Sequence, residues 1–93
     1  MKIILEIGDR VGHTNTGFQE YTVTGFGNYT VNGLVSADGV YAILVDYSAE
    51  GESKHIALVK HLIALDDNGD SIGSPDASPE YYTLTHEIKA TKL

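Results

Sequence analysis

The stretch from Tyr41 to Tyr47 constrains the fold of this chain most strongly. It reads Tyr-Ala-Ile-Leu-Val-Asp-Tyr, so three aliphatic residues stand in a row with an aromatic residue at each end of the stretch. A short apolar run rich in β-branched and aromatic residues is typical of a strand that is buried on both faces or nearly so. Turn-forming residues precede it at 38–39 and follow it at 48–51. We therefore predict a central strand with a sharp turn at each end.

Short strands and turns are predicted on both sides of this central strand. Gly25 and Gly27 interrupt a strand that otherwise alternates well, which predicts a bend or bulge there. Asn32-Gly33 is a strong hairpin signal, because both central positions of a type I′ turn need a positive φ. A short extended piece is expected at 10–13. The predicted strands are 2–7, 20–26 with a continuation at 29–31, 41–47, 54–58, 62–66 and 81–89.

Residues 54–65 fit two interpretations. A helix would explain the spacing of four apolar residues, but the segment has no clear helix N-cap and lies among strands. We predict two strands joined by one helical turn at 59–62, with a helix as the alternative. Strands at short spacing without a long amphipathic helix favour an all-β fold, a small barrel or sandwich. The residues with helical spacing are Ile56, Val59, Leu62 and Ile63.

The composition indicates one acidic domain spanning residues 1–93. Thirteen acidic residues face six basic ones, giving a formal net charge of −7. Because such a chain repels phosphate backbones and has no basic cluster, direct nucleic-acid binding is not expected. The chain has no cysteine, which excludes disulfides and thiol chemistry. No stretch reaches membrane-spanning length or resembles a signal peptide, so we expect no membrane contact and a cytoplasmic location.

Acidic residues gather between Asp66 and Glu80, a region without any basic residue. With the carboxylates of a second loop they predict a negative surface, and the alternative is a set of solvated loops. Asp66 to Asp70 resembles the start of a calcium loop, but Ser71 and Ala77 stand where that loop needs Gly and Glu. We expect a hairpin turn there. The candidate partner-binding residues are Asp66, Asp67, Asp70, Asp76, Glu80, Glu50 and Glu52.

No catalytic or metal-binding signature is found. The four histidines are the only candidates for metal ligation or acid–base catalysis, and their spacing does not place a metal-binding pair on one helix face. No serine or threonine stands in a nucleophile-elbow context. We therefore expect no enzyme activity, no cofactor, no metal and no catalytic residue. The histidines are His13, His55, His61 and His86.

The order of several motifs resembles SH3-like barrels of the Tudor and KOW type. Those modules open with a GDxV strand, continue with a GxVxG strand and an aromatic-ended apolar strand, and close on a helical turn and a strand. The resemblance covers residues 7–65, while the connection at 29–40 is longer than usual and the tail after Leu65 is extra. The matching stretches are Ile7–His13, Gly17, Tyr21–Phe26, Ala42–Tyr47 and His61–Leu65.

This resemblance implies a small SH3-like barrel of about five to seven short antiparallel strands with a single helical turn. Residues 7–65 would form the barrel core, 66–80 an acidic loop region and 81–93 a C-terminal edge strand. Tudor domains bind methylated side chains in an aromatic cage, whereas KOW modules that bind nucleic acid carry basic loops that this chain lacks. The rings that would form an aromatic surface, or else belong to the core, are Tyr21, Phe26, Tyr41 and Tyr47.

The sequence favours a non-catalytic acidic module whose partner is a protein with a basic surface. One version is a virus- or mobile-element-encoded inhibitor that docks on a nucleic-acid-handling host protein. The alternative is a structural or assembly subunit that forms homo-dimers or larger assemblies through the edge strand at 81–89. A third hypothesis is a small hydrolase or metal enzyme that uses the histidines, which bound zinc and a loss of activity on His→Ala would support.

Overall fold

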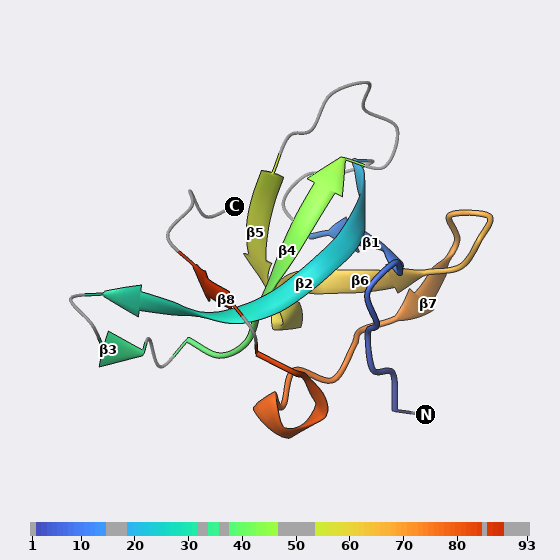
Figure 1. The fold of residues 1–93 in the computed structure, drawn as a ribbon. Helices are drawn as coiled ribbons and strands as arrows, with labels where there is room; N and C mark the ends of the chain where they lie inside the picture. The colour runs from blue at the N-terminus through green and yellow to red at the C-terminus, as the bar shows by residue number, and fades with distance from the viewer. Residues whose placement is uncertain are drawn as a thin grey trace.

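The fold consists of a single β-sheet (Figure 1). The structure is a computed structural model, and it describes residues 2–14, 19–31, 34–35, 38–46, 54–84 and 86–88. Within this part of the chain the elements are β1 (Arg10–His13), β2 (Glu20–Val31), β3 (Leu34–Val35), β4 (Tyr41–Asp46), β5 (Lys54–Leu58), the 3-10 turn η1 (Val59–His61), β6 (Leu62–Leu65), β7 (Ser71–Gly73), the 3-10 turn η2 (Pro79–Tyr81) and β8 (His86–Ile88).

The sheet is open, with the strand order β5-β4-β2-β1-β6-β7, while β3 and β8 each pair with β2. The predicted all-β class is therefore confirmed, whereas closure into a barrel is not seen among the described residues. The six antiparallel strands of this path agree with the predicted five to seven, and β3 and β8 add two short strands. The described residues contain two 3-10 turns where one helical turn was predicted, and β8 runs parallel to β2 instead of antiparallel. In the described residues no helix has the length and apolar character needed to cross a membrane.

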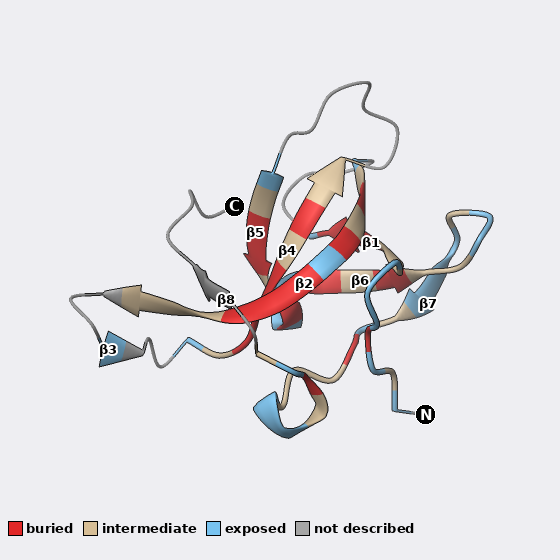
Figure 2. Ribbon diagram, in the orientation of Figure 1, coloured by how far each residue is buried: buried red, intermediate tan, exposed pale blue. Residues whose placement is uncertain are grey.

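Strand β4, predicted as the central strand, is second from one end of the sheet, between β2 and β5. Its residues are buried or half-buried on both faces, as predicted (Figure 2). Ala42 and Leu44 are fully buried in the main core. Tyr41, on the opposite face, is buried in a second cluster with Ile56. Successive side chains of a strand point to opposite faces, so this alternation places apolar groups on both sides of the sheet.

A bulge in β2 decides which aromatic ring enters the main core. The pairing with β4 shifts between Val23 and Gly25, so Thr24 is the extra residue. The predicted bulge is therefore confirmed. One extra residue reverses the alternation of side chains that follows it. As a result Phe26 packs in the same core as Tyr21, although strict alternation would place these two rings on opposite faces.

The segment from Lys54 to Leu65 forms strand, 3-10 turn and strand, so the helical alternative is excluded. The backbone N–H of Val59 in η1 donates to the carbonyl of Val40 at 2.9 Å, and its side chain is buried. This contact reverses the chain after β5 and directs β6 to the far side of the sheet. There β6 pairs with β1, with Gly12 opposite Ile63.

The two ends of the chain depart from the prediction. Residues 2–7 are not a strand, although Leu5 is buried in the main core. Their backbone forms isolated hydrogen bonds and does not pair with a neighbouring strand among the described residues. The predicted strand at 81–89 is likewise wrong over its first half, where the 3-10 turn η2 and irregular backbone precede β8. Tyr82 explains this, since its buried side chain packs on Phe26 with ring centroids 4.6 Å apart. Residues 89–93 lie outside the described part.

Candidate functional site

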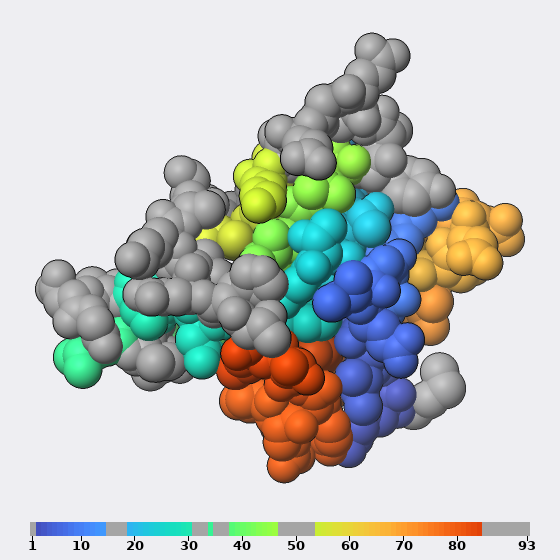
Figure 3. Space-filling model, viewed as in Figure 1, coloured from blue at the N-terminus to red at the C-terminus, as the bar shows by residue number. Residues whose placement is uncertain are grey.

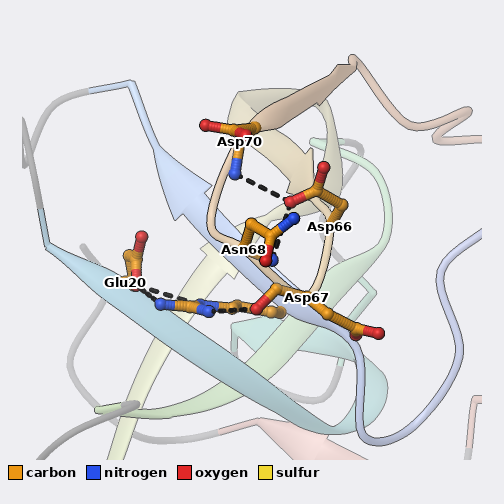
Figure 4. A network of polar contacts seen from close by, with 6 residues as sticks. Glu20, Asp66, Asp67, Asn68 and Asp70 are labelled. Atoms are coloured by element: carbon orange, nitrogen blue, oxygen red, sulfur yellow. Dashed lines mark hydrogen bonds and ion pairs between the residues drawn. The ribbon is translucent and has the colours of Figure 1, made fainter.

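The acidic turn, defined as Asp66–Asp70, joins β6 to β7 and is built around one carboxylate (Figure 4). Oδ1 of Asp66 accepts the backbone N–H groups of Asn68 and Asp70, both at 2.9 Å. The backbone closes the same turn, with the Asp66 N–H donating to the Asp70 carbonyl at 2.9 Å. Aspartate favours this role because its short side chain reaches backbone donors two residues further along the chain. The predicted tight turn is confirmed.

Arg10 of β1 fastens this turn to the sheet. Its Nη1 donates to the carbonyl of Asp67 at 3.0 Å, and its Nε donates to Oε2 of Glu20 at 2.9 Å. Its Nη2 also binds Oε2 of Glu20, so a charge-assisted pair joins β1 to β2. Gly69 lets the turn approach this pair, since it has a φ of +84° and an added Cβ would lie 2.7 Å from Oε1 of Glu20.

The acidic turn presents its remaining carboxylates to solvent. Asp67 and Asp70 are exposed, and the turn stands at the edge of the molecule (Figure 3). Of the described carboxylates only that of Glu20 pairs with the guanidinium of Arg10, which meets the turn itself at the Asp67 carbonyl. The region is therefore negative although it contains an ion pair. The hydrogen bonds of Asp66 and Arg10 hold the backbone of the turn in this geometry.

The other predicted acidic residues do not join this turn. Asp76 and Glu80 lie around η2, which Figure 1 places at a different end of the molecule. Oδ1 of Asp76 accepts the backbone N–H of Ser78 at 2.8 Å, and the Asp76 N–H donates to the Ile3 carbonyl at 2.7 Å. Three of the seven residues therefore share one surface. Glu50 and Glu52 fall outside the described residues.

The predicted aromatic surface is not formed by the rings that the structure describes. Tyr21, Phe26 and Tyr41 expose only 3%, 6% and 2% of their area. They also lie in two separate clusters, since Tyr41 packs on the opposite face of the sheet from the other two. These side chains belong to the core, which was the alternative interpretation of the sequence. Tyr47 falls outside the described residues.

The histidines are distributed over the sheet. His13 is buried, and its ring meets the ring of His61 edge-on at a centroid distance of 6.1 Å. Burial first, and repulsion from His61 second, lower the pKa of His13. Nε2 of His55 lies 2.9 Å from Oδ1 of Asp46. Nothing is described for the side chain of His86, and among the described residues no three His, Asp or Glu side chains are placed to hold a metal ion.

Sequence analysis missed Arg10 and Glu20, which hold the acidic turn in place. Arg10 precedes Asp67 by 57 residues, so no local pattern connects them. The available signal was that Arg10 is the only arginine in a chain with 13 acidic residues. Comparison of this chain with protein-family models, with curated proteins and with solved structures found no match.

Proposed function

We propose that this chain is a non-catalytic, cytoplasmic interaction module that docks on the basic surface of a partner protein through the acidic turn. The observation that supports this most directly is the clamp of Arg10 on Glu20 and on the Asp67 carbonyl. It fixes the backbone of the turn while Asp67 and Asp70 remain exposed. A turn whose backbone is already held in one geometry loses little backbone freedom on binding, so more of the interaction energy contributes to affinity.

Electrostatics favours a basic partner at both long and short range. The net charge of −7 attracts a positive surface before contact and accelerates association. At contact the exposed carboxylates accept charge-assisted hydrogen bonds from lysine or arginine. We propose a partner whose basic surface serves nucleic-acid binding, because such surfaces are built to receive spaced negative groups. A virus- or mobile-element-encoded inhibitor of that partner is the specific version.

We also propose that the sheet belongs to the SH3-like barrels of the Tudor and KOW type. Two features support this assignment. A 3-10 turn between β5 and β6 carries the chain across the core, and β6 then pairs with β1, the first strand. The bulge at Thr24 supplies the local twist with which a strand bends around a small core.

Affinity capture from a lysate with the complete chain tests the proposed function. Capture is performed at about 0.05 M salt and washed at about 0.5 M salt, where exposed charges are strongly screened. The test variant carries Asp67→Asn and Asp70→Asn, and it keeps Asp66, whose carboxylate holds the turn. The matched control carries Asp76→Asn and Glu80→Gln, which removes the same charge around η2.

We expect the wild-type chain and the matched control to capture one basic, nucleic-acid-handling protein that the salt wash releases. The test variant should lose it. Equal loss in both variants would show that only net charge matters and would overturn the assignment to the turn. Capture that survives the wash and both variants would overturn the electrostatic proposal. Recovery of the chain alone would favour self-association, although β8, the strand within the predicted edge at 81–89, has only three residues.

A further inference from the structure

A hollow lies on the outer face of the sheet beside the acidic turn. Val11, Gly12 and His13 of β1 are all buried, and because successive residues of a strand face opposite sides, Gly12 faces away from the side that Val11 and His13 face. Its cross-strand neighbours are Glu20 of β2 and Ile63 of β6. Since residues paired across strands share a face, the missing side chain of Gly12 leaves a space between a carboxylate and an aliphatic group.

This space is a groove of about 190 Å³ with a largely apolar lining. Ile63 and Leu65 are half-buried, and they alternate with the buried Leu62 and Ala64. Aliphatic side chains are therefore placed on the outer face of β6. The groove is smaller than the range of about 300–1,000 Å³ that is usual for small-molecule sites. It suits one inserted side chain better than a cofactor. The remaining lining residues include His13, Gln19, Gly69 and Ser71.

The negative charge beside the groove favours an inserted side chain that is positively charged. Both bonds from Arg10 to Glu20 end on Oε2, and neither reaches Oε1, which lies near Gly69 at the groove. Oε1 therefore keeps capacity to accept a hydrogen bond from a second donor. With the acidic turn adjacent, carboxylates outnumber the one guanidinium here. A cationic head group on an apolar stem matches this combination.

We propose that the groove receives one lysine or arginine side chain of the protein partner. The stem of that side chain would pack on Ile63 and Leu65, and its charged head would meet Oε1 of Glu20. This inference rests on the proposed function, because it gives the acidic turn an adjoining pocket for the partner's basic residue. A burial of this kind anchors an interface more strongly than exposed charge pairs at its rim.

The probe for this proposal is a capped tripeptide, acetyl-Gly-Arg-Gly-amide, titrated into the complete chain and followed by amide NMR. A second arm uses the lysine peptide, and the neutral control replaces arginine with citrulline, which has nearly the same shape without charge. We expect saturable shifts at the amides of Gly12, Ile63 and Leu65 with at least one basic peptide. The citrulline peptide should give none.

Two variants add bulk to the groove from two of its lining strands, β1 and β7. Gly12→Ala adds a methyl group whose nearest neighbour is Cδ1 of Leu65 at 3.9 Å, an ordinary contact distance. Ser71→Val adds bulk from the exposed start of β7, where a β-branched residue suits a strand. Each variant should weaken peptide binding about tenfold, as expected when an inserted group meets an occupied space. Thermal unfolding and the remaining amide shifts check that each variant stays folded.

The failures of the two proposals are distinguishable. Shifts confined to residues 66–70, unchanged by Gly12→Ala and by Ser71→Val, would overturn the groove proposal and leave docking through the acidic turn intact. Equal shifts with the citrulline peptide would also overturn it, because the head-group charge would be irrelevant. The absence of any shift at millimolar peptide would overturn it as well, while the capture experiment would still decide the proposed function.

Discussion

Two regions of this molecule carry exposed acidic groups, and they are held in different ways. The acidic turn is fixed by polar bonds, from Asp66 to backbone N–H groups and from Arg10 to the Asp67 carbonyl. The region around η2, residues 74–84, is fixed by an aromatic anchor. There Tyr82 is buried against Phe26, its hydroxyl donates to the Asp76 carbonyl, and it accepts the Leu5 N–H at 3.5 Å.

The two regions therefore differ in what holds their backbone, although both carry carboxylates. Around η2 the backbone is tied to the N-terminal residues, and Nζ of Lys2 lies 4.4 Å from the centroid of the Tyr81 ring. Beside the acidic turn, the guanidinium of Arg10 forms a salt bridge with Glu20. Asp67 and Asp70 are exposed, and neither is part of the salt bridges found among the described residues. This contrast is why we assign docking to the turn.

The largest effect is expected from removing the aromatic anchor. Tyr82→Ala should lower the free energy of unfolding by about 3–5 kcal/mol, because it leaves a cavity against Phe26. Tyr82→Phe retains the ring and should cost about 1–2 kcal/mol for the lost hydroxyl bonds. Urea unfolding followed by circular dichroism measures both values. A cost below about 1 kcal/mol for Tyr82→Ala would contradict the anchor and weaken the comparison.

A pair of glycine variants tests whether the acidic turn is packed more tightly against the ion pair than strand β1 is against its neighbours. Gly69→Ala should destabilise by about 1–3 kcal/mol, since it combines a positive φ with a clash on Glu20. Gly12→Ala is the matched control, with room for its methyl group, and should be neutral or stabilising by about 0.4–1 kcal/mol. Thermal unfolding of the two variants side by side measures the difference. Equal effects would argue against close contact between the turn and the ion pair.

The side of the sheet nearer the acidic turn should respond to acid through His13. Because the pKa of His13 is lowered in the folded chain, the unfolded chain binds more protons below its ordinary pKa of about 6.5. The free energy of unfolding should therefore fall as the pH drops through this range, by at most about 1.4 kcal/mol per pH unit.

Urea unfolding at pH 7.5, 6.5 and 5.5 measures this slope in the wild-type chain and in His13→Gln. The variant should show a shallower slope, whatever its stability at neutral pH. The variant differs from the wild-type chain at residue 13 alone, so the other titratable groups, among them the paired His55 and Asp46, are common to both proteins. Identical slopes would show that His13 is not the group responsible.

The smallest effect on stability is expected from the exposed carboxylates themselves. Asp67→Asn with Asp70→Asn should change the free energy of unfolding by no more than about 0.5 kcal/mol, as usual for surface positions. The same denaturation experiments measure this value. A loss above about 1 kcal/mol would mean that these side chains hold the turn, and the binding experiments would then need a different variant.

Much of the fold could be predicted from the sequence, because its signals are local. The apolar run at 41–46 predicts a strand covered on both faces, and 54–65 forms the predicted strand, turn and strand. The glycines at 25 and 27 predict the bulge, but its position at Thr24, which moves Phe26 into the core, depends on pairing with β4. The strands predicted at the two ends of the chain were wrong over residues 2–7 and over the first half of 81–89. β-Branched residues at 3–7 and alternation at 81–89 do not show whether a neighbouring strand exists to pair with.

The candidate site was less predictable than the fold. Sequence analysis identified Asp66, Asp67 and Asp70 correctly as neighbours in one turn, because they are adjacent in the chain. The clamp that joins β1, β2 and this turn depends on contacts across 10 and 57 residues of sequence. Only the folded sheet brings such groups together. The groove at Gly12 has the same origin, since it arises from cross-strand pairing.

The measurement that tests the central claim most directly is the affinity for the purified partner from the capture experiment, measured against salt concentration. The wild-type chain, the variant at Asp67 and Asp70, and the matched variant at Asp76 and Glu80 are compared by calorimetry. We predict that neutralising the acidic turn weakens binding at least about tenfold and flattens the salt dependence, while the matched variant changes affinity less than about twofold. The reverse ranking, or equal loss in both variants, would contradict the account.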